Sequence, residues 1–256
     1  MADESAQVGS AQTAMDRDDT QTGRRLTRRE ILALIGGGGA ALLTGLKGAS
    51  AAPADPAAAC VARPRHIEGP YFVDAGLNRS DIRGDPRSGL VKTGVPLRLA
   101  FRVSQSNGSR CLPLSGAQVD MWHCDAEGLY SDTSAFQAST LGQKFLRGYQ
   151  MTDRKGIAAF TTIFPGWYPN RAVHIHFKIR TDAGSKQRRE FTSQIYFEDD
   201  LTDVIHKQAA YTGRGQRKVR NNRDLIYLIG GSRLLLPLRE EKKGYAGTFD
   251  IALDLS

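Results

Sequence analysis

Apolar and polar residues alternate with a period of two along much of the chain beyond residue 60. The alternation is clearest at residues 97–103, 119–123 and 173–179. Successive side chains of a β-strand point to opposite faces of its sheet, so each run predicts a strand with one buried face. Further strands are expected at residues 157–164, 191–197, 225–230, 233–238 and 248–253.

Turn-forming residues separate these runs. Gly, Asn, Asp and Pro gather at residues 106–108, 153–156, 165–166 and 182–184. No long helical period follows residue 60, and one short helix is expected at residues 202–211. Short strands with turn residues between them are typical of a β-sandwich. The pattern therefore predicts an all-β protein, a single antiparallel β-sandwich domain with long loops over residues 52–256.

Residues 1–51 depart from this pattern and predict an export signal. Polar residues are followed by a basic stretch at 24–29, an apolar run at 31–46 and the small residues Ala49-Ser50-Ala51. A basic region, an apolar region and an A-x-A site together are typical of a secretory signal, and Ala49-Ser50-Ala51 is the pattern of a cleavage site. Thr27-Arg28-Arg29-Glu30-Ile31-Leu32 resembles a bacterial twin-arginine signal, which implies export of the folded protein. An ordinary secretory signal is the alternative.

The apolar run also bears on membrane attachment and location. It has 16 residues, five of them Gly, whereas a transmembrane helix needs about 20 strongly apolar residues. We therefore expect no stable membrane anchor and an exported protein, periplasmic or extracellular in a bacterium.

Composition and charge narrow the class of partner. Hydrophobic residues make up 40% and charged residues 24% of the 256 residues, which excludes a collagen-like, largely disordered or polytopic membrane protein. The net charge of +8 lies entirely beyond residue 51, because residues 1–51 carry six basic and six acidic side chains. A basic surface favours anionic partners. No basic run is interleaved with aromatic residues, so we expect no nucleic acid partner.

Three cysteines, Cys60, Cys111 and Cys124, leave the disulfide pairing open. An exported protein enters an oxidising compartment, where one disulfide and one spare thiol are expected. If residues 116–123 form one strand, Cys111 and Cys124 lie at its opposite ends, too far apart to pair. Cys60 is then expected to pair with either of the other two.

Two histidines on one predicted strand are candidate metal ligands. In the run 173–179, His174 and His176 point to one face, while the apolar residues between and beyond them point to the other. Two imidazoles about 6–7 Å apart along a strand can share one metal ion. Two half-exposed polar residues would give the same pattern, so the pair alone is a weak signal. His123, in the strand before Tyr130, is expected to be structural.

The neighbourhood of the pair strengthens this signal. Tyr168 and Arg171 precede His174 by six and three residues, and Tyr130 lies in the loop after the 119–123 strand. Taken singly, each tyrosine is typical of an amphipathic side chain at a strand end. Tyr71 and Tyr149 are expected either to line the pocket or to pack against other side chains without a role in binding.

Eight segments in this order resemble the intradiol ring-cleavage dioxygenases, and among them the protocatechuate 3,4-dioxygenase β-sandwich. They extend from about residue 60 to residue 230. The segments are Glu68-Gly69-Pro70-Tyr71-Phe72, Ser80-Asp81-Ile82-Arg83, Leu114-Ser115-Gly116-Ala117, residues 122–130, Phe145-Leu146-Arg147-Gly148, residues 161–166, Arg171 with His174 and His176, and residues 192–197.

The resemblance implies one non-haem Fe(III) per chain, bound by Tyr130, Tyr168, His174 and His176. Fe(III) is a hard cation and phenolate a hard anion, and a metal ion promotes deprotonation of its ligand. The implied reaction inserts both atoms of O2 into a catechol-type substrate and gives a cis,cis-muconate-type diacid. Zinc is the alternative metal, although two tyrosines are unusual zinc ligands.

The resemblance also implies roles for individual side chains. Tyr168 is expected to leave the metal and take a substrate proton. Arg171 would stabilise negative charge that develops on the substrate, or else form a surface salt bridge. Gln194 would donate or accept a hydrogen bond near the substrate, or else be an ordinary strand residue. The Tyr168–His174 spacing is shorter than in protocatechuate members, so catechol, protocatechuate and hydroxyquinol all remain candidate substrates.

Two other classes of function compete with this interpretation. A non-catalytic binding module on the same scaffold predicts loss of one or more ligands, yet all four are present. A zinc hydrolase would need a carboxylate base, and no H-E-x-x-H motif occurs. The sequence leaves a homo-oligomer open.

Overall fold

The computed structural model describes residues 60–106, 110–134, 139–181 and 189–255. These residues all belong to one unit, Pro53–Ser256. The predicted export signal lies outside the described residues. Among the helices that are described, none is long and apolar enough to cross a membrane.

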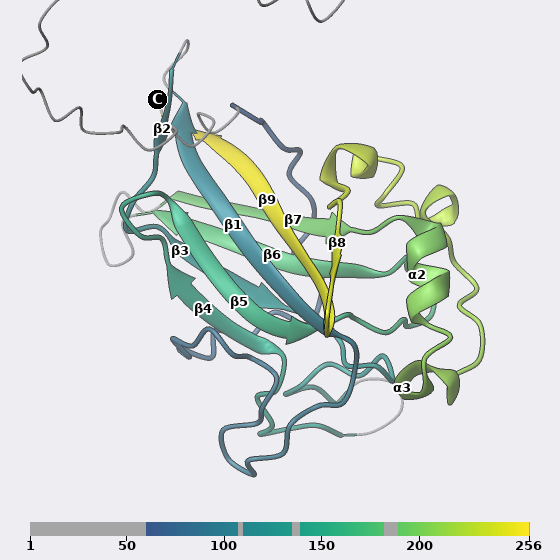
Figure 1. Ribbon diagram of the computed structural model, residues 1–256. Coiled ribbons are helices and arrows are strands. Elements are labelled where there is room, and N and C mark those ends of the chain that lie inside the picture. The colour runs from purple at the N-terminus through teal and green to yellow at the C-terminus, as the bar shows by residue number, and fades with distance from the viewer. Residues whose placement is uncertain (1–59, 107–109, 135–138, 182–188, 256) are drawn as a thin grey trace, which may run out of the picture. The chain divides into compact units, whose positions relative to one another are not determined.

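Two β-sheets form the framework of the described chain (Figure 1). The first sheet has the order β2-β1-β9-β8, and β5 pairs with β1 beside β2. The second has the order β4-β3-β6-β7. The strands of the first sheet are β1 (Pro96–Ser106), β2 (Cys111–Pro113), β5 (Ile157–Ile163), β8 (Arg239–Glu241) and β9 (Gly244–Asp254). Those of the second are β3 (Gln118–Trp122), β4 (Arg147–Met151), β6 (His174–Thr181) and β7 (Arg189–Tyr196).

The core lies between the two sheets, as the sandwich prediction requires. Phe101 of β1 and Phe249 of β9 meet Phe177 of β6, with ring centroids 5.2 Å and 5.4 Å from that of Phe177. All three rings are fully buried. Apolar side chains at alternate positions of β1 and β6 are thus removed from water, the main favourable term in folding. The odd-numbered apolar residues of β6 fill this core, which leaves His174 and His176 on the opposite face.

One pairing departs from the predicted antiparallel arrangement. β1 and β9 run parallel, from Leu97 opposite Tyr245 to Ser106 opposite Asp254. The prediction is therefore right for the second sheet and wrong for this pair. Parallel neighbours need a long connection, and here most of the domain separates the two strands. Alternation within each strand carries no information about the direction of its neighbour.

The predicted elements near the C-terminus also differ in part. The expected helix at 202–211 is two short helices, α2 (Asp199–Ile205) and α3 (Ala209–Thr212). Residues 225–230 form turns rather than a strand, and the 3₁₀ helix η2 (Gly231–Leu234) occupies the start of the strand expected at 233–238. Residues 248–253 do lie in a strand, β9. Because β7 leads directly into α2, the helices lie at the end of the second sheet where β6 begins (Figure 1).

The cysteine pairing is one of the two left open by the sequence. Cys60 and Cys111 form a disulfide that links residues 51 positions apart, with Cα atoms separated by 5.5 Å. Cys124 is a buried free thiol. The bond fastens the first described residue to β2.

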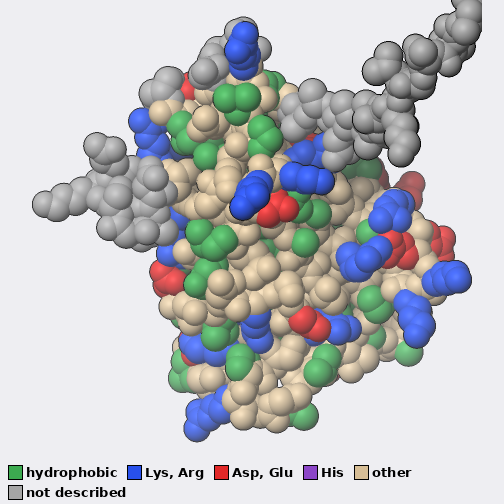
Figure 2. Space-filling view, turned by 60° about the vertical axis from the view of Figure 1, so that its left-hand side comes forward, with side chains coloured by type: hydrophobic (Ala, Val, Ile, Leu, Met, Phe, Trp, Pro, Cys, Tyr) green, Lys and Arg blue, Asp and Glu red, His purple; other side chains and the backbone are tan. Residues whose placement is uncertain are grey.

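Basic residues are dispersed over the face shown in Figure 2. Lys and Arg side chains lie there among Asp, Glu and single apolar side chains. On this face the excess positive charge therefore does not form one continuous patch.

Candidate functional site

His174 and His176 lie at the start of β6 with their rings directed at the same point. Their Nε2 atoms are 3.0 Å apart, and 2% and 1% of the two residues is exposed. β6 is an inner strand, between β3 and β7, so both backbones are held on two sides. Two donors each about 2 Å from a shared ion, at right angles, would be about 3 Å apart. The pair thus has the spacing of two ligands of one metal ion.

The protonation of His174 favours metal binding. Its Nδ1 is 2.7 Å from the carbonyl oxygen of Ala172, so the proton lies on Nδ1 and the Nε2 lone pair is free. Burial, and then the nearby charge of Arg171, hold the pKa of His174 well below its usual range. Burial, and then His174, do the same for His176. Both rings are therefore neutral, which is the form that binds metals.

Two tyrosines complete this group. The hydroxyl of Tyr168, in the loop after β5, is 3.1 Å from Nε2 of His174. Tyr130, in the loop after β3, has its ring centroid 5.5 Å from that of Tyr168 and 6.1 Å from that of His176. Its hydroxyl is buried and has no hydrogen-bond partner among the described residues. An unpaired buried hydroxyl is costly, and a bound cation would compensate for it.

Burial raises the pKa of both phenols. For Tyr130 the second cause is Tyr168, whose phenol lies beside it. For Tyr168 burial outweighs the opposing effect of Arg171. Without a cation both hydroxyls therefore remain protonated at neutral pH, and a bound multivalent cation would reverse this preference.

A tight turn after β3 positions Tyr130. The Asp125 carboxylate accepts hydrogen bonds from the backbone N–H groups of Glu127 (3.0 Å) and Leu129 (2.9 Å) and pairs with Lys92 at 2.7 Å. Gly128 follows with a φ of +79°, a left-handed conformation that favours glycine. The turn ends at Leu129, so the next side chain, that of Tyr130, is directed back toward β6.

The loops that carry the two tyrosines pack backbone against backbone. A Cβ at Gly128 would lie 2.2 Å from the carbonyl oxygen of Trp167. A Cβ at Gly166 would lie 2.4 Å from the carbonyl oxygen of Ala126. Only glycine permits this approach at either position. The two contacts fix the separation of Tyr130 and Tyr168.

Arg171 is held beside the group by three side chains. Its Nε donates to Oδ2 of Asp224 (2.9 Å), and its Nη2 donates to Oε1 of Gln194 (2.5 Å) and to the hydroxyl of Tyr196 (3.2 Å). Asp224 is fully buried and also accepts from the backbone N–H of Ala172 at 2.7 Å. Although burial opposes it, the anionic and phenolic neighbours give a net rise in the pKa of Arg171, so the guanidinium stays charged.

Gln194 contacts Arg171 and is not among the residues that line the cavity. It lies opposite His176 in the β6–β7 register and is fully buried. Its Oε1 accepts from Arg171 and Tyr196, and its Nε2 donates to the carbonyl oxygen of Ile67 at 3.1 Å. Both the oxygen and the nitrogen of its side-chain amide thus have protein partners.

Aromatic rings support the ligands from outside. The ring of Trp122 stacks on that of His176, with centroids 5.1 Å apart and planes inclined by 8°. Tyr71 stacks on Tyr130 with centroids 4.3 Å apart. A Cβ at Gly69 would lie 3.3 Å from Cε1 of His176, so this backbone covers the imidazole.

A cavity of about 290 Å³ opens onto these side chains. None of the described residues that line it is acidic. Its size is near the lower end of the range for small-molecule sites. The lining comprises Ile67, Gly69, Pro70, Tyr71, Gly128, Leu129, Tyr130, Thr133, Tyr168, Pro169, Asn170, Arg171, His176, Arg214 and Ile226.

The remaining candidates of the sequence lie elsewhere or have structural partners. His123 is fully buried, with Nδ1 2.8 Å from the carbonyl oxygen of Cys124 and Nε2 2.7 Å from the hydroxyl of Thr162. Tyr149 lies in β4, away from the cavity, whereas Tyr71 lines it. In the part of the chain that the structure describes, no group of three or more His, Cys, Asp or Glu side chains that could hold a metal ion is found. The available donor set is therefore two histidines with two tyrosines.

Two functional residues were not identified from the sequence. Asp224 binds Arg171 from 53 residues away. It is the single acidic residue of residues 204–238, and this isolation within a basic segment was the signal that could have identified it. Trp122 supports His176 from the neighbouring strand. The resemblance included Trp122 within a matching segment, which was the only available signal for it.

Comparison with known proteins agrees with this architecture. The sequence model of one protein family, described as dioxygenase, matches residues 67–254. Catechol 1,2-dioxygenase 1 of Acinetobacter lwoffii is 29% identical over 175 residues, which cover 59% of this chain and 50% of that protein. The protocatechuate 3,4-dioxygenase beta chain of Burkholderia cepacia is 31% identical over 182 residues, covering 66% of this chain and 70% of that protein. The chain thus spans about half the length of the first of these relatives.

A solved structure extends the likeness to three dimensions. An intradiol ring-cleavage dioxygenase from Tetranychus urticae superimposes with a TM-score of 0.65 and 27% identity, covering 76% of this chain and 95% of that one. The chain belongs to this dioxygenase family, and its homologues are intradiol ring-cleavage dioxygenases.

Proposed function

We propose that this protein is an Fe(III)-dependent intradiol dioxygenase that cleaves a catechol-type substrate with O2 to a cis,cis-muconate-type diacid. The observation that carries the proposal is the convergence of three donor atoms. The Tyr168 hydroxyl and Nε2 of His176 lie 3.1 Å and 3.0 Å from Nε2 of His174. The unpaired buried hydroxyl of Tyr130 supplies a fourth donor beside them.

The donor set suits a ferric ion. Two neutral imidazoles and two phenolates offer two negative charges, which offset most of a 3+ charge in a buried setting. Zinc sites favour cysteine, histidine and carboxylate ligands, and tyrosine is not among them. Bound in this group, Fe(III) would supply Lewis acidity and a template for the substrate and O2.

Unequal burial assigns different roles to the two tyrosines. Tyr130 is 4% exposed, and its ring is stacked on that of Tyr71. Tyr168 is only half-buried and lies at the cavity wall. Tyr168 is therefore the residue that would give way to the substrate, and its phenolate oxygen would take a proton from a substrate hydroxyl.

Arg171 supplies fixed positive charge at the cavity. Asp224 and Gln194 hold its guanidinium in one orientation before substrate binds. A preorganised cation stabilises negative charge that develops on the substrate during oxygen insertion without a reorganisation cost. The apolar wall formed by Ile67, Pro70 and Ile226 accepts the aromatic ring.

Export is part of the same proposal. The Cys60–Cys111 disulfide supports it, because such bonds persist in oxidising compartments and are rare in the cytosol. We propose that the protein acts outside the cytoplasm and that residues 1–51 direct it there.

Visible absorption of the purified protein tests the proposal. Phenolate-to-Fe(III) charge transfer should give a broad visible band, and a catechol added without O2 should shift it to longer wavelength. Admission of O2 should then consume one O2 per catechol. A colourless protein containing one iron per chain would refute the tyrosine ligands. A coloured protein that binds catechol without consuming O2 would instead indicate a binding module.

A further inference from the structure

A second cavity lies on the far side of the loop that borders the candidate active site. It is a groove of about 730 Å³ between α2 and residues 212–223. Arg214 lines the first cavity, and its neighbour Gly215 lines the groove. Adjacent Cα atoms are about 3.8 Å apart, so a single segment of the chain separates the first cavity from the groove at this point.

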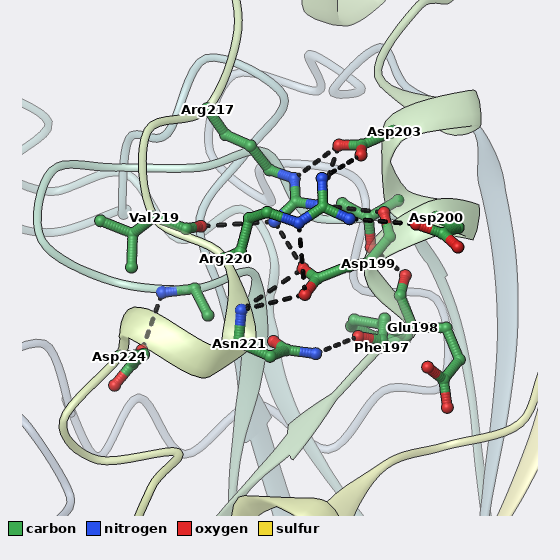
Figure 3. Close-up of polar contacts among 12 residues, drawn as sticks. Phe197, Glu198, Asp199, Asp200, Asp203, Arg217, Val219, Arg220, Asn221 and Asp224 are labelled. Carbon is green, nitrogen blue, oxygen red and sulfur yellow. Dashed lines mark hydrogen bonds and ion pairs between the residues drawn. The ribbon is translucent and has the colours of Figure 1, made fainter. Parts of the chain in front are cut away.

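The groove has a rigid wall of paired arginines (Figure 3). Arg217 is only 4% exposed and donates to Oδ1 of Asp199 at 2.6 Å and to Oδ1 of Asp203 at 2.8 Å. Arg220 pairs with Asp203 at 2.5 Å and with Asp200 at 3.0 Å. These ion pairs join α2 to the loop, so the groove keeps its form without a ligand.

Three other cations in the groove are unpaired. The side chains of Lys207, Lys218 and Arg223 are exposed and line the groove. None of them forms an ion pair or a side-chain hydrogen bond with any residue that the structure describes. Asp199, Asp200 and Asp203 together carry one more charge than Arg217 and Arg220 neutralise. The three unpaired cations outweigh that charge, so the groove remains positively charged.

The character of the lining restricts the ligand. No described residue that lines the groove is apolar, and the only ring in the described lining is the imidazole of His206, which is already stacked on Tyr211 with ring centroids 4.9 Å apart. An apolar ligand would find no matching surface, and single-stranded nucleic acid would find one ring that already stacks on Tyr211 rather than a series of free rings. Thr212, Gln216 and Asn222 add neutral groups that can hydrogen-bond to hydroxyls.

From these features we infer that the groove binds a carboxylate-bearing polysaccharide. Its carboxylates would pair with Lys207, Lys218 and Arg223, and its hydroxyls would bond to the neutral side chains. The Cys60–Cys111 disulfide favours this polyanion over duplex nucleic acid, since it indicates a compartment outside the cytosol. A chain bound here lies beside the wall of the catalytic cavity.

Binding of polygalacturonate to the iron-loaded protein tests this inference. Calorimetry at several salt concentrations should show an affinity that falls steeply as salt rises. The methyl-esterified polymer, with the same backbone and little charge, should bind at least tenfold more weakly. The triple variant Lys207→Gln/Lys218→Gln/Arg223→Gln should also lose at least tenfold in affinity, with its melting temperature and catechol turnover unchanged.

A matched variant separates the groove from net charge. Lys155→Gln/Lys242→Gln/Lys243→Gln removes the same charge from exposed lysines away from the groove and should bind polygalacturonate like the parent. Equal weakening of both triple variants would overturn the inference, as would failure of the parent to bind at low salt. Tighter binding of duplex DNA than of polygalacturonate, lost in the groove variant, would overturn the assignment to polysaccharide.

Discussion

Arg171 and Asp224 form a largely buried ion pair across 53 residues of sequence, with Nε 2.9 Å from Oδ2. Only 14% of the Arg171 side chain and none of the Asp224 side chain is exposed. Asp224 also accepts from the backbone N–H groups of Ala172, Ile226 and Tyr227. One carboxylate therefore connects the strand that carries the histidines to the segment that forms part of the cavity wall.

Removing this carboxylate should destabilise the fold. Asp224→Ala leaves a buried guanidinium and three backbone N–H groups without their acceptor, and we expect a loss of about 3–5 kcal/mol in the free energy of unfolding. Urea denaturation measures it. Asp200→Ala is the control, because Asp200 is fully exposed and its pairing with Arg220 is screened by water. Equal effects of the two substitutions would contradict a structural role for the buried pair.

Gly128 gives a prediction that separates backbone conformation from steric contact. Gly128 and Gly116 have nearly the same φ, +79° and +78°. A Cβ at Gly128 would lie 2.2 Å from the carbonyl oxygen of Trp167, whereas a Cβ at Gly116 would meet nothing within 4 Å. Gly116→Ala should cost about 1–2 kcal/mol for its conformation alone. Gly128→Ala should cost about 1–3 kcal/mol more and should weaken iron binding, because the turn that positions Tyr130 must move.

Denaturation and iron content measured on both glycine variants provide the test. If Gly116→Ala and Gly128→Ala lost the same stability and both retained iron, the contact between the two tyrosine loops would not position the ligand.

The alternation of residues 173–179 predicted the placement of the histidines well, because a side chain's face on a strand depends only on local geometry. The tyrosines came from resemblance rather than from pattern. Neither signal could locate Asp224, whose partner Arg171 lies 53 residues earlier, in the loop before β6. The same residue explains the wrongly predicted strand at 225–230. Its carboxylate accepts the N–H groups of Ile226 and Tyr227 and so turns an apolar segment that would otherwise favour extension.

The parallel pairing of β1 with β9 was unpredictable for a related reason. It joins residues about 150 positions apart, and the alternation within either strand is the same for a parallel and an antiparallel neighbour. For the disulfide, strand geometry excluded a Cys111–Cys124 bond but could not decide whether Cys60 pairs with Cys111 or with Cys124. Long-range partners, rather than local structure, thus account for what the sequence left undetermined.

Two buried histidines provide a contrast between binding and packing. Nε2 of His174 faces Nε2 of His176 and the hydroxyl of Tyr168. Both ring nitrogens of His123, in contrast, form hydrogen bonds, one with the carbonyl oxygen of Cys124 and one with the hydroxyl of Thr162. His174→Gln should lower Fe(III) affinity at least about 100-fold, since removal of supporting residues alone costs 10–100-fold. His123→Gln should lower stability but retain one iron per chain and the visible band. Iron analysis of both variants measures the difference, and loss of iron from His123→Gln alone would contradict the assigned ligands.

Stability should fall as the pH falls below 6.5, and His123 should account for a defined part of the loss. Burial lowers the pKa of His123 to about 4, from an ordinary value of 6.5. His123 in the unfolded chain therefore becomes protonated below pH 6.5, whereas His123 in the folded protein becomes protonated only near pH 4. The stabilisation is fully present above pH 6.5 and is lost between these values, by about 3 kcal/mol in all.

Comparison with His123→Gln isolates this contribution from other titrating groups. At pH 7.5 the parent protein should be the more stable of the two in urea denaturation. At pH 4.5 the difference should have narrowed by about 2–3 kcal/mol, because the variant has no imidazole to protonate in its unfolded state. His174 and His176 titrate in both proteins, so their contribution cancels. A difference that stays constant between pH 7.5 and 4.5 would show that His123 is not held neutral by burial.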